Sequence, residues 1–478
     1  MELLVKDKIY INNPPDNVLQ WIAQMSTFEN PENASRVKRG SWLGNLQQYV
    51  YLYEIFNNNN GSRMVACPRG LLRPLYDTFK NTIPIDIKDE RILPKVDEFH
   101  IKDTITIRDY QKEAIDTALL RAQGIVVSPA GSGKTVMGVA ISQGCKSKTL
   151  WFTHKKELIQ QTKDRFMEYT DIPEERIGIY GDGSKDIEDI TIATVQTLAN
   201  MDAKTFNEFV TQFGCVIVDE VHHAAADTWR MIDRFPARYR IGLTATPVRG
   251  DGLTEAAKAV VGKEIYTVDR QRLVVDKRIM KAKMYYTVTP CNYDEYSKDH
   301  PTLLRVMSND PKRNEILVKL ADVACQTRDC LLVLTNLVYH TENLAELIRA
   351  RLEESKLARP VFTFHAQSKF KIDDIKDLDQ FVIVATFGKA EEGLDIPKLD
   401  CLLLASPLKG DVKNRKRLEQ SLGRIERTMI GKKAPIVYDV VDSDGLSLYK
   451  WDTRQIFYAE KGIETKGMDI PSEYLDSL

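Results

Sequence analysis

The sequence predicts an α/β protein in which two doubly wound domains follow one another and a small α+β module precedes them. From about residue 104, short apolar runs alternate with helical segments, and each run is apolar on both faces, as strands of a buried parallel sheet are. The same alternation returns with different residues in the second half of the chain. The first hundred residues lack it, which sets them apart as a module of another kind.

The first doubly wound domain is expected to span residues 104–275. Residues 109–122 and 155–169 have the pattern of helices, and they supply crossover connections between parallel strands. The predicted strands are the apolar runs 124–129, 149–154, 190–195, 215–220 and 240–246.

The second doubly wound domain is expected to span residues 276–478. The stretch from Asp251 to Pro311 is charged and carries few strong signals, and its most strand-like part is residues 268–288. The domain boundary is therefore placed within this stretch. The predicted strands of the second domain are the runs 330–336, 360–366, 381–387, 401–407 and 435–442.

Residues 1–103 are predicted to form an accessory module that binds DNA. The segment 47–56 is rich in aromatic residues, and the segment 68–79 begins with a basic turn. Aromatic and basic side chains together suit duplex or junction DNA, and the candidates are Trp42, Tyr49, Tyr51, Arg63, Arg69 and Arg73. Burial in a structural core explains the aromatic residues equally well, so no site is assigned to them.

The composition is that of a globular protein without an extreme charge. The chain has 478 residues, enough for two to four domains, and 43% of them are hydrophobic. Its 67 Lys and Arg residues nearly cancel its 68 Asp and Glu residues. The overall charge therefore does not single out a polyanionic partner, although a local basic track is enough to bind nucleic acid.

The seven cysteines form no CxxC pair, and several lie in apolar runs. We therefore expect buried thiols in a reducing compartment, and neither a zinc site nor a disulfide framework. The first residues lack the apolar core of a signal peptide, and no uncharged apolar stretch approaches the roughly 18 residues of a membrane span. We expect a cytoplasmic monomer, in a bacterial cell or a phage-infected host, with no membrane partner.

The stretch SPAGSGKT, residues 128–135, joins a predicted buried strand to a predicted helix and is typical of a phosphate-binding loop. In such a loop backbone N–H groups surround phosphate oxygens, a lysine reaches the β- and γ-phosphates, and a Ser or Thr hydroxyl binds Mg²⁺. Ser128 stands where the usual pattern has glycine, and a plain strand-to-helix turn is the alternative. The residues expected to hold ATP are Ala130, Gly131, Ser132, Gly133, Lys134 and Thr135.

Two carboxylates end the predicted strand CVIVDE and supply the acidic partner that a phosphate-binding loop requires. Asp219 is expected to bind Mg²⁺ through water, together with the hydroxyl of Thr135. Glu220 is expected to orient and deprotonate the attacking water. The alternative is an acidic turn after a core strand.

The segment QSLGRIERT near the end of the second domain carries two arginines, Arg424 and Arg427. Residues three apart lie on one face of a helix, so both guanidinium groups are expected to point the same way. Two such groups aimed across a cleft suit a γ-phosphate, as arginine fingers do. A solvated basic helix is the alternative.

The order of these motifs on two tandem α/β domains resembles that of the superfamily 2 helicases. The shared features are the lysine-bearing loop, DEVH at 219–222, GLTATP at 242–247 and Q-x-x-G-R-x-x-R at 420–427. The resemblance covers residues 104–445, and members of the family often lack the first glycine of the loop. It implies two RecA-like domains that bind ATP and Mg²⁺ between them and step along nucleic acid through largely sequence-independent backbone contacts.

The resemblance also implies roles for residues outside these motifs. Arg108 and Gln111 match the segment that reads adenine, while Gly393 and Asp395 face the nucleotide. The residues that couple hydrolysis to nucleic-acid binding are His222, Thr244, Thr246 and Gln420. Those that contact the nucleic-acid strand are Thr153, His154, Thr194, Gln196 and Thr386.

DEVHH and GLTATPVRGDG look more like the DNA translocases of this superfamily than its RNA-unwinding branch. The compact N-terminal module and ACPRGLL, residues 66–72, resemble phage branch-migration helicases such as that of T5-like phage. We therefore expect an ATP-dependent DNA helicase that remodels branched DNA in replication, recombination or repair. An RNA helicase, a restriction-complex translocase and a non-enzymatic nucleic-acid clamp remain the alternatives.

Overall fold

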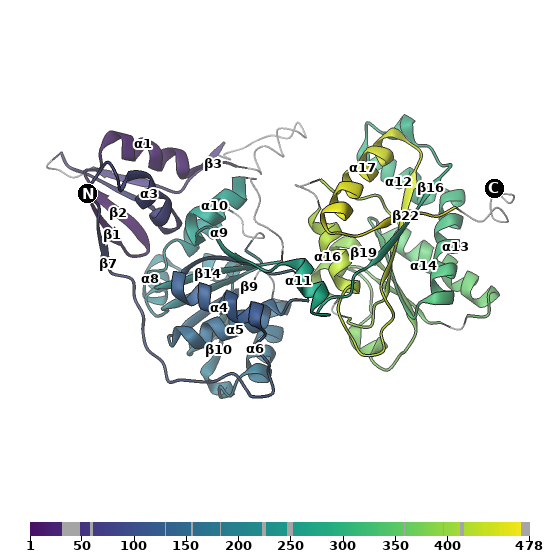
Figure 1. The fold of residues 1–478 in the computed structure, drawn as a ribbon, viewed down its shortest axis with the longest axis horizontal. Coiled ribbons are helices and arrows are strands. Elements are labelled where there is room, and N and C mark those ends of the chain that lie inside the picture. The colour runs from purple at the N-terminus through teal and green to yellow at the C-terminus, as the bar shows by residue number, and fades with distance from the viewer. Residues whose placement is uncertain are drawn as a thin grey trace. The chain divides into compact units, whose positions relative to one another are not determined.

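The structure of the protein is a computed structural model. In it the chain forms two compact units (Figure 1). The first unit comprises Met1–Pro129 and Gly133–Val268, and the second comprises Asp269–Leu478 with the short segment Ala130–Ser132. The residues that the structure describes are 1–30, 48–57, 61–129, 131–153, 156–181, 183–221, 226–245, 252–357, 359–394, 396–411 and 415–469.

The first unit is built on an eight-stranded sheet in the order β11-β10-β12-β9-β13-β14-β8-β15, in which only β11 is antiparallel to its neighbour. Its strands are β8 (Gln123–Val127), β9 (Thr149–Thr153), β10 (Ile177–Gly181), β11 (Ser184–Lys185), β12 (Ile190–Thr194), β13 (Cys215–Asp219), β14 (Tyr239–Thr244) and β15 (Glu264–Thr267). Its helices are α4 (Asp109–Arg121), α5 (Lys134–Cys145), α6 (Glu157–Tyr169), α7 (Val195–Ala199), α8 (Ala203–Val210), α9 (Ala226–Ile232) and α10 (Gly252–Val261). One group of helices, α4, α5 and α6, packs side by side, whereas α9 packs on α7 and α10.

The second unit is built on a parallel seven-stranded sheet in the order β18-β19-β17-β20-β21-β16-β22. Its strands are β16 (Lys283–Thr289), β17 (Cys330–Thr335), β18 (Val361–Phe364), β19 (Phe381–Thr386), β20 (Cys401–Leu404), β21 (Ile436–Asp442) and β22 (Thr465–Gly467). Its helices are α11 (Arg270–Val275), α12 (His300–Asn309), α13 (Pro311–Thr327), α14 (Val338–Glu354), α15 (Phe387–Gly393), α16 (Lys416–Ile425) and α17 (Gly445–Glu460).

Both faces of the second sheet are buried, which explains why its strands are continuous apolar runs. Leu332 and Leu334 of β17 enter one hydrophobic cluster, while Leu331 and Val333 enter the other. Successive side chains of a strand point to opposite faces, so each face needs its own apolar residues. The two parallel sheets with their helical layers confirm the predicted fold class.

The N-terminal module mixes a mainly antiparallel five-stranded sheet with helices, as predicted. Its sheet has the order β5-β6-β2-β1-β7, and β3 pairs with β4 outside it. The strands are β1 (Glu2–Val5), β2 (Lys8–Asn12), β3 (Thr27–Glu29), β4 (Tyr49–Tyr51), β5 (Glu54–Asn57), β6 (Arg63–Pro68) and β7 (Asp86–Asp89). The helices are α1 (Asp16–Met25), the short 3-10 helix η1 (Arg69–Leu71) and α3 (Leu72–Phe79).

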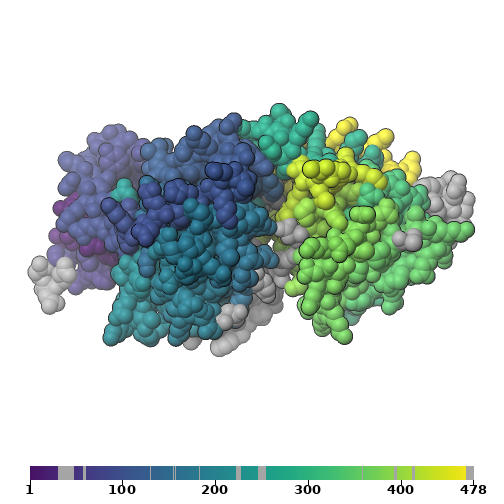
Figure 2. Space-filling view, turned by 90° about the horizontal axis from the view of Figure 1, so that it is seen from below, coloured from purple at the N-terminus to yellow at the C-terminus, as the bar shows by residue number. Residues whose placement is uncertain are grey.

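The module shares its hydrophobic core with the first parallel sheet. Ile9 and Val65 of the module belong to the same cluster of buried residues as Phe235 and Val260 of the doubly wound region. Figure 2 shows the purple and blue surface of the early residues adjoining the teal surface of this region. Burial of apolar surface is the main favourable term in folding, so the module and this sheet stabilise each other.

Residues 268–288, the most strand-like part of the predicted boundary stretch, form a strand only from Lys283 onward. Residues Arg270–Val275 form helix α11, whose first turn is capped because the side chain of Asp269 accepts a hydrogen bond from the N–H of Gln271 at 2.8 Å. Strand β16 follows it and enters the second sheet beside β21.

No helix among the described residues combines the length and the apolar composition that a membrane span requires.

Candidate active site

The glycine loop after β8 and the acidic pair at the end of β13 lie at the carboxyl edge of the first sheet. Strands β13, β14 and β8 are parallel neighbours, so the segments that follow them leave the sheet on the same side. The backbone N–H of Ser128, just after β8, donates to the carbonyl of Thr244 at the end of β14, 2.8 Å away. Crevices at this edge are where open α/β sheets bind ligands.

The loop after β8 uses two glycines in the left-handed region of backbone conformation. Gly131 and Gly133 have φ values of 83° and 82°. A Cβ atom at Gly133 would lie 2.3 Å from Nε2 of Gln111, so no side chain fits there. The loop can therefore turn tightly and present its backbone before α5 begins at Lys134, with Thr135 next in the same turn.

Lys134 is ion-paired with Asp219, the last residue of β13, and with Glu220, which follows it. Its Nζ lies 3.0 Å from Oδ1 of Asp219, and it also forms a short ion pair with Glu220. Burial opposes the charge of Lys134, but the two carboxylates outweigh it and raise the pKa of the lysine. A cation and two anions are thus collected at the start of α5, where a helix N-terminus favours anions.

Glu220 has a backbone conformation that is rare for a residue with a side chain. Its φ is +50°, and its N–H donates to Oδ1 of Asp219 at 2.9 Å. Left-handed backbone at a non-glycine residue costs roughly 1 kcal/mol or more and is often found at functional sites. The turn places the two adjacent carboxylates on the same lysine.

Gln111 connects the start of α4 to the glycine loop. It is 2% exposed, and its Oε1 accepts a hydrogen bond from the backbone N–H of Arg108 at 3.0 Å. The guanidinium of Arg108 in turn donates to the hydroxyl of Tyr110 at 3.1 Å. The amide end of Gln111 approaches Gly133, so this side chain spans the two segments expected to hold the base and the phosphates.

Two of the residues expected to contact nucleic acid end neighbouring strands. Thr153 of β9 and Thr194 of β12 are paired in register, and each is 1% exposed. The hydroxyl of Thr194 lies 2.9 Å from that of Thr197 in the first turn of α7. Gln196, in the same turn, is exposed, so its side chain lies on the surface.

In the second unit, helix α16 ends earlier than the arginine spacing predicted. It spans Lys416–Ile425, so Arg424 lies in its last turn and Arg427 lies beyond it. Arg424 donates to the carbonyl of Glu391 in α15 at 2.8 Å, whereas Arg427 forms an antiparallel bridge with Ile279. The expectation that both arginines share one helical face was wrong, because the chain leaves the helix between them.

Two residues that the motifs did not indicate fix the segment that carries Arg427. Glu426 is 1% exposed and forms an ion pair with Arg270 of α11, and burial raises the pKa of this carboxyl. Lys432 donates to the carbonyls of Ile425 and Arg427, both at 2.7 Å, and burial lowers the pKa of this lysine to about 8. Arg270 and Glu426 are 156 residues apart in the chain, so no local sequence pattern links them.

The remaining candidates are placed as follows. Thr386 ends β19 and precedes α15, Gly393 is the last residue of α15, and Gln420 is half-buried in α16. In the N-terminal module, Tyr49 and Tyr51 are 41% and 48% exposed, whereas Arg69 is buried. Six of the candidates lie outside the described residues: Trp42, Ala130, His154, His222, Thr246 and Asp395.

Comparison with known proteins gives matches to nucleic-acid motors. Residues 104–249 match the family model of the type III restriction enzyme, Res subunit. The DNA 3'-5' translocase XPB2 of Sulfurisphaera tokodaii is 30% identical over 363 residues, which cover 68% of this chain and 80% of that protein. A protein of Escherichia phage T5, described as probable helicase D10, is 26% identical over 393 residues that cover 80% of this chain and 81% of its own.

Other relatives are longer than the region that matches. The chain spans only 54% and 55% of two archaeal Rad25 proteins, from Haloarcula marismortui and Halobacterium salinarum. Among solved structures, the DNA-bound type ISP restriction-modification enzyme LlaBIII is similar, with a TM-score of 0.57 and 16% identity. That match covers 78% of this chain and 32% of LlaBIII, and it bears on the fold alone.

Proposed function

We propose that the protein is an ATP-dependent DNA translocase or helicase, starting from its family: the chain belongs to the superfamily 2 helicases that include the DNA 3'-5' translocase XPB2. This membership confirms the resemblance that the ordered motifs predicted. One observation carries the proposal for the site, namely that Lys134 is held between Asp219 and Glu220 directly after the glycine loop. A lysine for the phosphates and carboxylates for the metal and the attacking water are among the groups that phosphoryl transfer uses.

The residues of the loop fit a nucleoside triphosphate with Mg²⁺. The left-handed glycines Gly131 and Gly133 leave the backbone open to an anion, since no Cβ atom covers it. Lys134 would hold the β- and γ-phosphates, while Thr135 and Asp219 would hold the metal. Bound Mg-ATP supplies the phosphoryl group whose transfer to water releases free energy.

Glu220 is the proposed general base. In the described geometry its carboxylate is ion-paired with Lys134. When the lysine turns its charge toward phosphate oxygens, Glu220 can instead accept a proton from water. The left-handed backbone at Glu220 keeps the carboxylate next to the metal-binding Asp219, so the base and the metal stay together.

Arg424 and Arg427 are the proposed arginines that meet the γ-phosphate. Arg424 is anchored through its Nη2 to the carbonyl of Glu391. Arg427 is held through its backbone by the bridge to Ile279 and by Lys432. The guanidinium is planar and always charged, so it can stabilise charge on a transferring phosphoryl group, and a fixed backbone keeps it positioned for this.

DNA is the proposed nucleic acid, and branched DNA is the proposed preference. The names of XPB2 and Rad25 refer to DNA, and the motifs DEVHH and VRGDG resemble the DNA-translocating branch. The preference for branched DNA rests on the resemblance to phage branch-migration helicases and on the module that precedes the motor.

The test measures ATP hydrolysis with single-stranded RNA, single-stranded DNA, duplex DNA and a four-way junction. We expect every DNA to stimulate hydrolysis more than RNA does, and the junction to stimulate it most. Lys134→Ala is the control, because loss of the phosphate-binding charge should abolish hydrolysis with every substrate. Stronger stimulation by RNA than by any DNA would overturn the DNA proposal, and equal stimulation by junction and single strand would overturn the preference for branches.

A motor subunit of a restriction complex is the second candidate, since the matched family model is that of a restriction subunit. The match covers residues 104–249, which hold the nucleotide-binding loop and the acidic pair common to motors of this superfamily. A restriction motor should be stimulated by linear duplex DNA as strongly as by a junction. The same set of substrates therefore separates the two candidates.

A further inference from the structure

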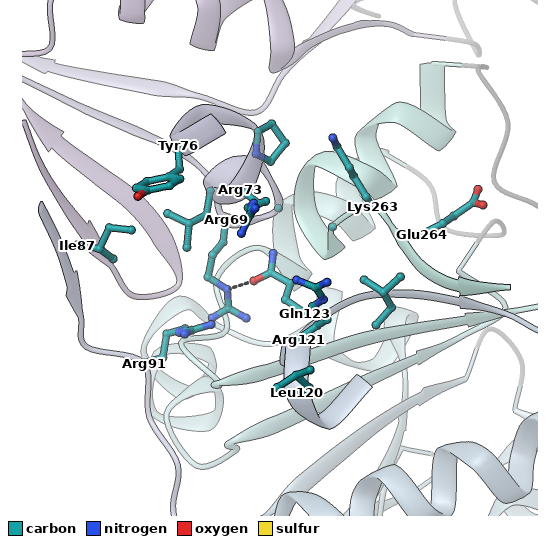
Figure 3. A pocket seen from close by; sticks show the side chains of 15 residues that line it. Arg69, Arg73, Tyr76, Ile87, Arg91, Leu120, Arg121, Gln123, Lys263 and Glu264 are labelled. Atoms are coloured by element: carbon teal, nitrogen blue, oxygen red, sulfur yellow. Dashed lines mark hydrogen bonds between the residues drawn. The ribbon is translucent and has the colours of Figure 1, made fainter. Parts of the chain in front are cut away.

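A groove of about 750 Å³ opens between the N-terminal module and the first parallel sheet (Figure 3). One wall comes from η1 and the start of α3, and another from the last turn of α4. The start of β15 and the chain after β7 complete it. The groove lies at the amino ends of β8 and β15, whereas the glycine loop follows the carboxyl end of β8. The groove and the candidate ATP site therefore lie at opposite ends of β8.

Close backbone packing fixes the shape of this groove. A Cβ atom at Gly70 of η1 would lie 2.3 Å from the carbonyl oxygen of Ala259 in α10. A Cβ atom at Gly124 of β8, where φ is 146°, would lie 2.3 Å from Cγ2 of Ile265. The module thus approaches α10, and β8 approaches β15, more closely than a side chain at either glycine would allow, so the walls of the groove are tightly packed.

The buried side chain of Arg69 connects the wall formed by the module to the wall formed by the first sheet. Its Nε donates to Oε1 of Gln123 at 2.7 Å, and its Nη1 donates to the carbonyls of Lys6 and Ala237 at 3.0 and 2.6 Å. These partners are all neutral, and Nη2 is buried without an acceptor among the described residues. The guanidinium therefore brings a positive charge to the groove that no directly bonded carboxylate cancels.

Positive charge dominates the lining of the groove. The cations are Arg69, Arg73, Arg91, Arg121 and Lys263, and the one lining carboxylate is that of Glu264. Arg73 pairs with Asp77 and Arg91 with Asp89, each at 2.7 Å. Arg121 and Lys263 are exposed, and the side chain of neither forms a hydrogen bond or ion pair within the described part of the chain.

The crowding of cations makes an anion favourable here. Burial lowers the pKa of Arg69, and the nearby charges of Arg240 and Arg91 lower it further. An anion in the groove would reduce this repulsion, and arginine forks match the geometry of phosphate oxygens. The cations come from four separate segments of the chain, so a chain of phosphates can meet several of them at once, which a single small anion cannot.

We propose that this groove binds the phosphate backbone of DNA, with Arg121 and Lys263 as direct contacts. The inference rests on the proposed function, and it assigns DNA binding to a joint surface of the module and the motor. Tyr76 and the exposed Leu120 add apolar area on which sugars can pack. The contact is independent of base sequence, since it uses the backbone alone.

The experiment uses the full chain with Arg121→Gln and Lys263→Gln combined. Binding of a labelled duplex and a labelled single strand is followed by fluorescence anisotropy over a series of salt concentrations. Each lost phosphate contact makes the slope of log K against log salt shallower by about 0.9, so the double variant should lose about two units of slope and at least about ten-fold in affinity. Hydrolysis of ATP without DNA should stay unchanged.

The matched control removes two other exposed cations of the same types, Lys298→Gln and Arg305→Gln, which lie in the second unit. It should keep the slope and affinity of the unaltered chain, and thermal unfolding should show that both variants are folded. An unchanged slope in the groove variant would overturn the inference and favour an acidic protein segment as the occupant. Failure of the unaltered chain to bind any DNA would instead contradict the proposed function.

Discussion

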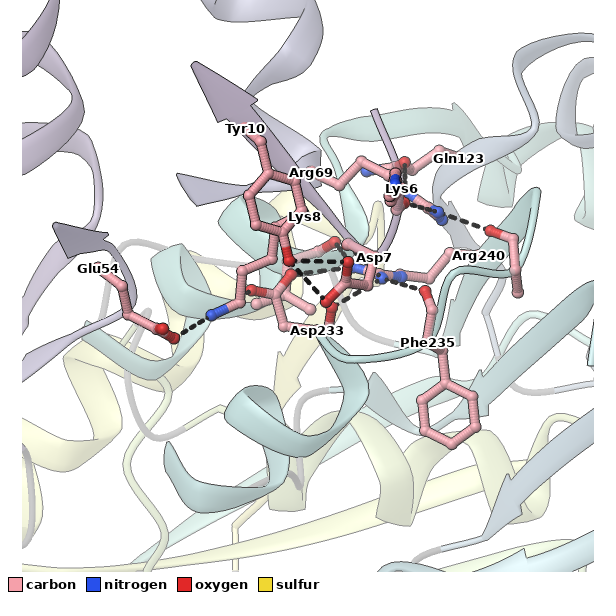
Figure 4. A network of polar contacts seen from close by, with 12 residues as sticks. Lys6, Asp7, Lys8, Tyr10, Glu54, Arg69, Gln123, Asp233, Phe235 and Arg240 are labelled. Atoms are coloured by element: carbon pink, nitrogen blue, oxygen red, sulfur yellow. Dashed lines mark hydrogen bonds and ion pairs between the residues drawn. The ribbon is translucent and has the colours of Figure 1, made fainter. Parts of the chain in front are cut away.

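Arg240 of β14 donates a hydrogen bond from Nη2 to the backbone carbonyl of Asp7, 3.0 Å away in the N-terminal module (Figure 4). The same guanidinium donates from Nη1 to Oδ1 of Asp233 at 3.1 Å. Arg240 and Asp233 are 0% and 1% exposed, so the pair is out of contact with water. The strand that ends in Thr244, the residue predicted to couple hydrolysis to nucleic-acid binding, is thus bonded near its other end to the module.

Replacement of this arginine should destabilise the whole first unit. Arg240→Leu leaves the carboxylate of Asp233 buried without its main cation, which typically costs about 3–5 kcal/mol in the free energy of unfolding. Arg240→Lys keeps the positive charge but loses the forked geometry of the guanidinium, so it should lower the free energy of unfolding by less than Arg240→Leu does. Urea unfolding of both variants measures this, and a Leu variant as stable as the unaltered chain would show that the pair contributes nothing.

The same contacts predict that removal of the module destabilises the rest of the first unit. Deletion of residues 1–103 would expose Phe235 and Val260 to water, since both belong to the core that the module shares. It would also leave Arg240 without the carbonyl of Asp7. We expect the remaining chain to unfold at lower urea than the full chain, so the role of the module is better tested by point changes in its groove than by deletion.

Substitution of the proposed base should separate binding from hydrolysis. Glu220→Gln keeps the shape of the side chain but cannot accept a proton, so hydrolysis should fall by at least about 10²-fold. Nucleotide binding should persist, because Lys134 and Thr135 are unchanged. Steady-state hydrolysis and the binding of a fluorescent ATP analogue are measured on the same preparation, and near-normal turnover would remove Glu220 from this role.

Arg427 should affect turnover far more than nucleotide affinity. Loss of an arginine finger slows phosphoryl transfer by about 10³-fold or more in other enzymes. Arg427→Ala should therefore keep measurable ATP binding and lose DNA-stimulated hydrolysis. A large drop in affinity with little change in turnover would mean that the arginine serves to bind the ground state instead.

The ion pair of Arg270 and Glu426 should position Arg427 rather than take part in chemistry. Arg270→Glu or Glu426→Arg alone places like charges together and should lower kcat while KM for ATP changes little. The double exchange restores the pair and should recover a large part of kcat, as a double-mutant cycle reveals. Urea midpoints serve as the control, since a purely structural pair would change stability and kcat in parallel in all three variants.

The sequence predicted those parts of the fold that depend on local pattern. Runs such as CVIVDE and FVIVATF are buried on both faces, and the residues after such strands meet at one edge because the strands are parallel. Residues 268–288 were harder, since LVV is compatible with a strand and with a helix. The side chain of Asp269 caps the helix and decides between them.

Contacts between distant residues could not be predicted in this way. Arg69 was a candidate for DNA, but its side chain is buried and holds Gln123 and the carbonyl of Ala237. A basic residue followed by glycine in the segment PRGLL gives no sign of such a partner. The core that the module shares with the motor could not be predicted for the same reason, because residues that are far apart in the chain form it.

His340 should make the second unit sensitive to acid. It is 0% exposed on α14, and Nε2 lies 2.9 Å from Oδ1 of Asn314. Burial, with a smaller effect of the charge of Arg313, lowers the pKa of His340 to about 3. The unfolded chain takes up this proton at about pH 6.5, so the unfolded state binds more protons than the folded state between these two values.

The neutral histidine therefore stabilises the fold fully above about pH 6.5, and this stability is lost as the pH falls toward 3. The loss amounts to about 1.4 kcal/mol for each pH unit in the window. His340→Gln keeps a donor for Asn314 and has no titrating group, so the difference in unfolding free energy between it and the unaltered chain should shrink by this amount per unit. Urea unfolding at pH 7, 6 and 5 measures the difference. A difference that does not change with pH would show that His340 has the same pKa in the folded and unfolded chain.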